Sequence, residues 1–74
     1  MNRIEIKKLL LDLDLTVTEI AAHAGGISRI AVWKYFDGKL KNPERRAAIQ
    51  GCLSERGQAR GVFVPVFWPE LAAA

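Results

Sequence analysis

The sequence predicts an all-α domain of four to five short helices with an extended apolar C-terminal tail. Apolar residues recur at i, i+3, i+4 and i+7 in successive segments, which is the spacing of one buried helix face. Helix-capping residues and turn glycines stand between those segments. The 74 residues suit one domain, in which we assign residues 1–57 to the helical part and residues 58–74 to the tail.

The first helix is predicted from Asn2 to Asp14. Its buried stripe is expected to consist of Ile6, Leu9, Leu10 and Leu13. Charged residues interrupt the apolar ones, so this segment is not expected to be a signal peptide, and no apolar run approaches the length of a membrane span.

One cysteine, Cys52, allows no intrachain disulfide and fits a reducing, cytoplasmic setting.

The second helix is predicted to begin at Val17, because Thr16 and Glu19 have the spacing of a capping box. The pair Gly25-Gly26 should end it, since glycine accepts the left-handed backbone conformation of a C-terminal cap. Its inward face is expected to consist of Val17, Ile20, Ala21 and Ala24. The small alanines on that face allow another helix to approach closely.

The third helix is predicted to start after the capping residue Ser28 and to run to about Phe36. The turn dipeptide Asp37-Gly38 should stop it there. Ile27, just before the cap, is expected to plug the turn. The face that anchors this helix to the protein should consist of Ala31, Val32 and Tyr35.

The fourth helix is predicted to start at Asn42-Pro43-Glu44, which combines a cap, a proline in the first turn and an acid near the positive end of the dipole. It should end near Gly57 and bury Ala48, Ile49, Cys52 and Leu53.

In the tail beyond the fourth helix, Pro65 and Pro69 exclude both a helix and a central strand. The apolar tail residues should either cover the domain's own core or form a dimer contact; they are Val62, Phe63, Val64, Val66, Phe67 and Trp68.

Residues 17–36 meet the physical demands of a helix-turn-helix motif: a small residue where two helices cross, a glycine turn, an apolar plug and an anchoring face. The second helix of that motif enters the major groove with the face opposite its anchor. There an arginine can pair with guanine and an isoleucine can contact a thymine methyl group. The expected base-reading residues are Ser28, Arg29, Ile30, Trp33 and Lys34. In the alternative interpretation, Ile30 and Trp33 pack against the aromatic tail and belong to the core.

Residues 29–46 contain six cations and two anions, a net charge of +4, whereas the whole chain carries +3. This concentration favours an anionic partner, although an ordinary solvated surface is the alternative. Contacts to phosphate position a protein on DNA without specifying sequence. The expected phosphate contacts are Thr16, Thr18, Lys39, Lys41 and Asn42, which Arg45 or Arg46 can join.

We expect no enzyme activity, cofactor, metal or small-molecule ligand. The single histidine, His23, has no partner cysteines for a structural zinc site and should lie on the outer side of the second helix. Cys52 should fill the core. The sequence contains no phosphate-cradling glycine loop, nucleophile elbow or zinc pattern.

Residues 16–70 resemble the small phage-type repressors of the lambda-repressor-like fold, and in particular the Ner-like proteins of Mu-like phages. The resemblance is carried by Ile20-Ala21, Gly26-Ile27-Ser28-Arg29, Val32, the basic loop Gly38 to Pro43, Arg46 to Ile49, and Trp68-Pro69. It implies a compact helical repressor with Arg29 and its neighbours in the groove. The chain differs from the family pattern in a second turn glycine, which reads as a one-residue insertion, and in a longer, more apolar segment 57–67, which favours a dimer formed through the tail.

The expected function is therefore a sequence-specific, double-stranded-DNA-binding transcriptional regulator, a phage or prophage repressor acting in the cytoplasm of a bacterial or phage-infected cell. A homodimer on a near-palindromic operator would place its half-sites one helical turn apart, roughly 34 Å. Two alternatives remain at this stage. One is a DNA-binding subunit of a transposition or recombination complex, and the other is an antitoxin-like module whose tail binds a protein.

Overall fold

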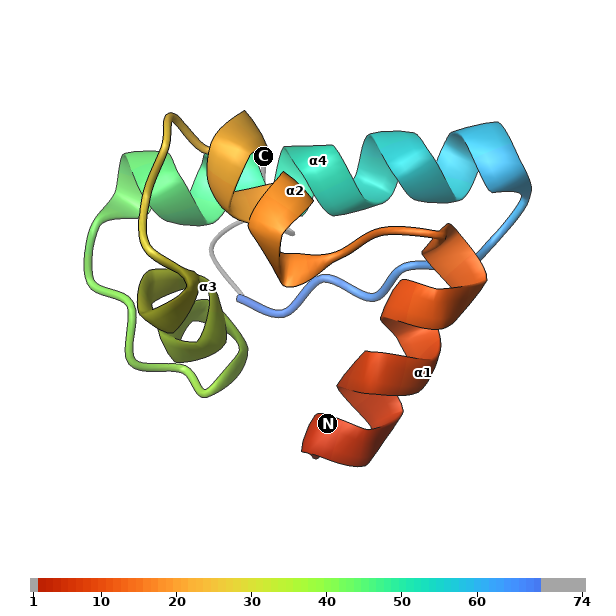
Figure 1. Cartoon of the computed structure of the whole chain (residues 1–74), viewed down its shortest axis with the longest axis horizontal. Helices are drawn as coiled ribbons and strands as arrows, with labels where there is room; N and C mark the ends of the chain where they lie inside the picture. Colours follow the sequence, from red (N-terminus) through yellow and green to blue (C-terminus); the bar gives the residue numbers. More distant parts are fainter. Residues whose placement is uncertain (1, 69–74) are drawn as a thin grey trace.

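The computed structural model describes residues 2–68, and within this range the chain forms four helices. They are α1 (Arg3–Leu13), α2 (Val17–His23), α3 (Arg29–Phe36) and α4 (Pro43–Arg60) (Figure 1). The long helix α4 is the base on which the others lie, with α2 packed between α3 and α4, and α1 against α4. The all-α prediction is confirmed for the described residues.

Each helix begins at a residue whose side-chain oxygen accepts hydrogen bonds from the first backbone N–H groups of the helix. These four caps have donor–acceptor distances between 2.8 and 3.2 Å, and they are Asn2, Thr16, Ser28 and Asn42. Caps of this kind satisfy N–H groups that have no partner inside the helix. The predicted starts of the second, third and fourth helices are confirmed.

The turn between α2 and α3 depends on two consecutive left-handed residues. Gly25 and Gly26 have φ of +96° and +78°, and their N–H groups donate to the carbonyls of Ala22 and Ala21 at 3.2 and 3.0 Å. A Cβ atom on either glycine would meet no other atom within 4 Å. The backbone dihedral, and not a lack of space, is therefore what requires glycine at these positions.

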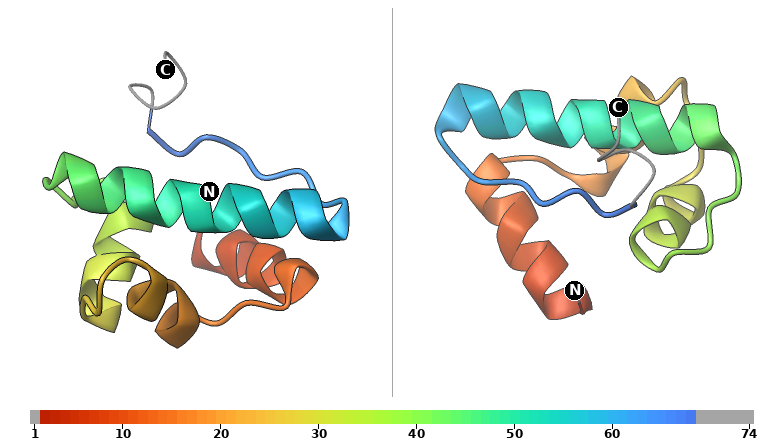
Figure 2. Two further views of the ribbon diagram at one scale, coloured as in Figure 1. Left: turned by 90° about the horizontal axis from the view of Figure 1, so that it is seen from above. Right: turned by 180° about the vertical axis from the view of Figure 1, so that it is seen from behind.

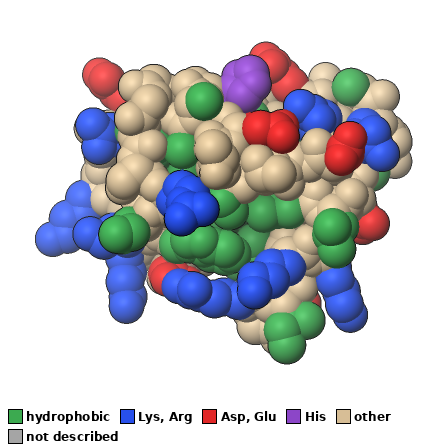
Figure 3. Space-filling model, viewed as in Figure 1, with side chains coloured by type: hydrophobic (Ala, Val, Ile, Leu, Met, Phe, Trp, Pro, Cys, Tyr) green, Lys and Arg blue, Asp and Glu red, His purple; other side chains and the backbone are tan. Residues whose placement is uncertain are grey.

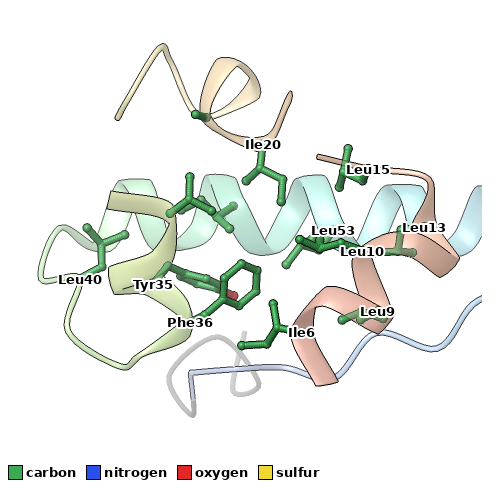
Figure 4. Packing of buried hydrophobic residues seen from close by; sticks show 13 residues of the cluster. Ile6, Leu9, Leu10, Leu13, Leu15, Ile20, Tyr35, Phe36, Leu40 and Leu53 are labelled. Atoms are coloured by element: carbon green, nitrogen blue, oxygen red, sulfur yellow. The ribbon is translucent and has the colours of Figure 1, made fainter. Parts of the chain in front are cut away.

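The core lies between α4 and the three shorter helices (Figure 4). The four residues predicted for the stripe of α1 are all buried. The fully buried side chains are Ile6, Leu13, Ile20, Val32, Tyr35, Ile49 and Leu53.

The prediction for α4 is wrong in two respects. The helix continues to Arg60 instead of ending near Gly57, because Gly61 is the residue that adopts the left-handed conformation, with φ +68°. Ala48 is exposed and Cys52 is only half-buried. The buried face is rotated toward Gln50 and Gly57, two residues that an apolar stripe does not reveal.

The tail packs against its own domain. Figure 2 (right) shows it running back along α4, past α1 and toward α3, where the rings of Phe67 and Trp68 contact Tyr35. Residues 62–66 are extended without forming a strand. Four tail residues pack against the core cluster, namely Val62, Val64, Phe67 and Trp68, whereas Phe63 and Val66 are 83% and 48% exposed. The part of the predicted tail at residues 69–74, including Pro69, lies outside the described residues.

A buried glutamine fixes the tail to α3 and α4. The Oε1 atom of Gln50 accepts from the hydroxyl of Tyr35 at 2.5 Å and from the backbone N–H of Phe67 at 3.2 Å. Its Nε2 atom donates to the carbonyl of Pro65 and to the hydroxyl of Ser54, both at 3.2 Å. One side chain thus joins the tail, the anchoring residue of α3 and the middle of α4.

Candidate nucleic-acid interface

Helix α3 has two chemically different faces. Val32, Tyr35 and Phe36 are buried against the rest of the domain. On the opposite side Arg29 and Lys34 are exposed, and Ile30 keeps 69% of its surface in solvent. Ser28 is exposed as well, and its hydroxyl accepts from the N–H of Ala31 as the helix cap. A helix with this division can present an arginine, a lysine and an isoleucine to a partner without disturbing its own packing.

Trp33 is half-buried and differs from the other expected base-reading residues. Its indole packs on Phe36, with 5.8 Å between the ring centroids. The guanidinium carbon of Arg3, in the first turn of α1, lies 4.6 Å from the centroid of the Trp33 ring. A further contact joins the same two elements, since Arg3 Nη2 lies 3.7 Å from Asp37 Oδ2.

The junction of α2 and α3 is closely packed. Ala21 is buried, and Ile27 is half-buried against the core. The carbonyl of Ala21 accepts from the N–H groups of Gly26 and Ile27, at 3.0 and 3.2 Å. The predicted small residue therefore lies on the buried face of α2, and the predicted apolar plug lies in the turn just before the cap of α3.

The expected phosphate-contacting residues are all exposed. Lys39 and Lys41 stand in the loop that follows α3, and Thr18 is in the first turn of α2. The side-chain oxygens of Thr16 and Asn42 already serve as helix caps. Figure 3 shows Lys and Arg side chains gathered along the side of the molecule formed by α3 and the α3–α4 loop.

The groups with possible acid–base or metal chemistry are separate from this basic surface. His23 is exposed at the end of α2. Burial raises the pKa of the Cys52 thiol, which works against a nucleophilic role for it. Among residues 2–68 no three histidine, cysteine or acidic side chains lie together as a metal site would require.

Three comparisons with known proteins, against protein-family models, curated sequences and solved structures, gave no match for this chain. Over the described part of the chain, no helix combines the length and the apolar character needed to cross a membrane.

Two residues of this region, Arg3 and Asp37, and the core residue Gln50 were not found from the sequence. Arg3 lies 30 positions before the indole that it covers, so no local pattern links them. Asp37 was interpreted only as a turn residue, although it stands seven positions after Ile30 and four after Trp33, which puts it on the same helix face. Gln50 gave no signal because a single polar residue on a helix is usually solvated.

Proposed function

We propose that this chain is a sequence-specific, double-stranded-DNA-binding transcriptional regulator of the helix-turn-helix type, and that it acts as a repressor of the lambda-repressor-like kind. The observation that carries the proposal is the division of α3 into a buried anchor and an exposed face with Arg29, Ile30 and Lys34. An arginine at the start of such a helix can pair with guanine, and an isoleucine can contact a thymine methyl group.

The charge distribution supports the same proposal. Lys39 and Lys41 follow α3 directly and are exposed, so they are suited to contact phosphates beside the groove that α3 enters. The exposed Thr18 at the start of α2 is a further candidate for such a contact. The proposal includes a homodimer on a near-palindromic operator, with the exposed tail residues Phe63 and Val66 as candidates for the contact between copies.

The decisive experiment selects binding sites for the purified protein from a random duplex library, and then measures the affinity of variants for the selected site. Arg29→Ala should cost about 1–3 kcal/mol of binding free energy and relax the preference at one base position. Lys39→Ala and Lys41→Ala should weaken binding to all sequences alike and reduce its salt dependence.

Three results would contradict the proposal. One is the absence of duplex binding by the wild-type protein. The second is a variant Arg29→Ala that binds every probe as the wild type does. The third is a library selection that enriches no sequence. Footprinting then separates a repressor, which protects a promoter, from a subunit of a recombination complex, which protects the ends of an element.

A further inference from the structure

Two charged residues, Arg3 of α1 and Asp37 at the end of α3, meet beside the exposed face of α3. Arg3 covers the indole of Trp33 and lies 3.7 Å from Asp37, which ends α3. Figure 1 shows the N-terminal end of α1 on the side of α3 where the α3–α4 loop begins. Both side chains reach solvent, with 61% of Arg3 and 38% of Asp37 exposed.

Asp37 is an unexpected residue at this position. It is one of only two anions in residues 29–46, and it continues the face formed by Ile30 and Trp33 by one helical turn. A carboxylate at the end of a helix that approaches DNA is repelled by the phosphates. The neighbouring Arg3 offsets that charge in the free protein.

Arg3 has the chemistry of a phosphate ligand. A guanidinium carries five N–H donors in a planar fork, and the stacking of one face on an indole leaves its edge available. The indole of Trp33 fixes the guanidinium beside α3. This arrangement pre-orients a cation at the border of the surface formed by Arg29, Ile30 and Lys34.

We propose, on the basis of the function proposed above, that Arg3 is a phosphate-contacting residue supplied by α1, and that Asp37 weakens DNA binding by repelling the same phosphate. In the free protein Arg3 pairs with Asp37. In the complex it contacts a DNA phosphate, and Asp37 limits the affinity for all sequences. The surface for nucleic acid thus includes the first turn of α1, outside the helix-turn-helix itself.

The test measures binding of a fluorescent random-sequence duplex pool by anisotropy at several salt concentrations. Arg3→Gln should weaken binding by about three- to tenfold and lower the slope of log K against log salt by about 0.9, the value for one phosphate. Asp37→Asn should strengthen binding by a few-fold. The matched control is Lys8→Gln, which removes a cation from the same helix about 140° away and should leave the slope unchanged.

The double variant Arg3→Gln/Asp37→Asn decides whether Arg3 itself contacts the phosphate. It should bind less tightly than Asp37→Asn alone. If the two bind equally, Arg3 acts only by neutralising Asp37, and the contact is overturned. If Arg3→Gln changes the affinity no more than Lys8→Gln does, the whole inference fails while the proposed function stands. If the wild-type protein binds no duplex, both fail. Circular dichroism melting of each variant verifies that it is folded.

Discussion

Gln50 is the residue through which the tail, α3 and α4 are joined. Its side chain is 8% exposed and takes part in four hydrogen bonds, with Tyr35, Phe67, Pro65 and Ser54. The oxygen and the nitrogen of the amide both form hydrogen bonds, and their four partners are themselves buried or half-buried.

Replacement of this glutamine should be costly. Gln50→Ala leaves the hydroxyl of Tyr35 and two backbone groups of the tail without their partner, and we expect a loss of about 2–3 kcal/mol in the free energy of unfolding. Urea denaturation measures it. Gln58→Ala, at an exposed glutamine of the same helix, is the control and should stay within about 0.5 kcal/mol of the wild type. Equal effects of the two substitutions would contradict the role of Gln50.

Tyr35 should make the domain sensitive to alkali. Burial raises the pKa of its hydroxyl above the ordinary value of about 10. In the unfolded chain the tyrosine releases its proton near that ordinary value, while the folded chain still retains it. The stabilisation is therefore fully present below about pH 10 and is lost as the pH rises from there toward the higher pKa of the folded state.

The ultraviolet absorption of tyrosinate measures this titration directly, because Tyr35 is the only tyrosine of the chain. The free energy of unfolding should fall with pH above about 10, by up to about 1.4 kcal/mol per pH unit. Tyr35→Phe should show a flatter decline, since it lacks the hydroxyl whose pKa burial raises. A folded protein whose tyrosine ionises at its ordinary pKa would contradict the prediction.

At the scale of the elements, α4 offers a matched pair of glycines. Both Gly51 and Gly57 lie inside the helix. A Cβ atom on Gly51 would meet nothing within 4 Å, whereas a Cβ atom on Gly57 would lie 2.6 Å from Val64 Cγ2 and 2.7 Å from the carbonyl oxygen of Val62. The first glycine only weakens the helix, and the second lets the tail cross it.

The same substitution should therefore have opposite effects at the two positions. Gly51→Ala should stabilise the domain by about 0.5–1 kcal/mol, because alanine is the better helix former. Gly57→Ala should destabilise it by about 1–3 kcal/mol, because the tail must move away from the helix. Thermal melting followed by circular dichroism gives both values, and two changes of the same sign would contradict the described path of the tail.

The sequence predicted the starts of the helices well because these are determined locally. Thr16, Ser28 and Asn42 cap helices through atoms two or three residues away. The inward face of α4 was predicted correctly at Ile49 and Leu53 but otherwise missed, because distant residues determine the rest of it. Gln50 and Gly57 are buried by a tail that reaches them from beyond the end of the helix.

The candidate site likewise has one part that the sequence predicted and another that it did not. Periodicity alone predicted which side of α3 carries Arg29, Ile30 and Lys34, and the structure leaves all three exposed. Trp33 is half-buried by Phe36, three residues later on α3, and by Arg3, whose position depends on the packing of α1 and cannot be predicted from the spacing within α3.

At the scale of the whole molecule, the tail is a part of the folded domain. Val62 and Val64 pack against the core, while Phe63 between them is 83% exposed. In a domain of fewer than about 80 residues, the hydrophobic core rarely contributes more than roughly 3–5 kcal/mol to the free energy of unfolding. The loss of the tail contacts would therefore remove a large part of the stability.

Charges placed on the two sides of the tail should separate folding from association. Val64 is half-buried against the core, so Val64→Asp places an unpaired carboxylate at that contact and should lower the melting temperature markedly. Phe63→Asp should leave the melting temperature nearly unchanged. If copies associate through the exposed side of the tail, Phe63→Asp should also shift the sedimentation coefficient to that of a monomer. A loss of folding in Phe63→Asp as large as that in Val64→Asp would contradict the orientation of the tail.

Each of the two tryptophans of the chain is covered by a guanidinium. One tryptophan lies on α3 and the other lies in the tail. Arg3 covers Trp33 on α3, and Arg46 lies 4.4 Å from the ring centroid of Trp68, whose indole N–H donates to the carbonyl of Tyr35 at 3.1 Å. The protein thus contains two natural fluorophores with separate tasks. With Trp68 replaced by phenylalanine, the emission would follow events at the surface of α3. With Trp33 replaced, it would follow the detachment of the tail, so that stopped-flow fluorescence could time the two processes independently in the same small protein.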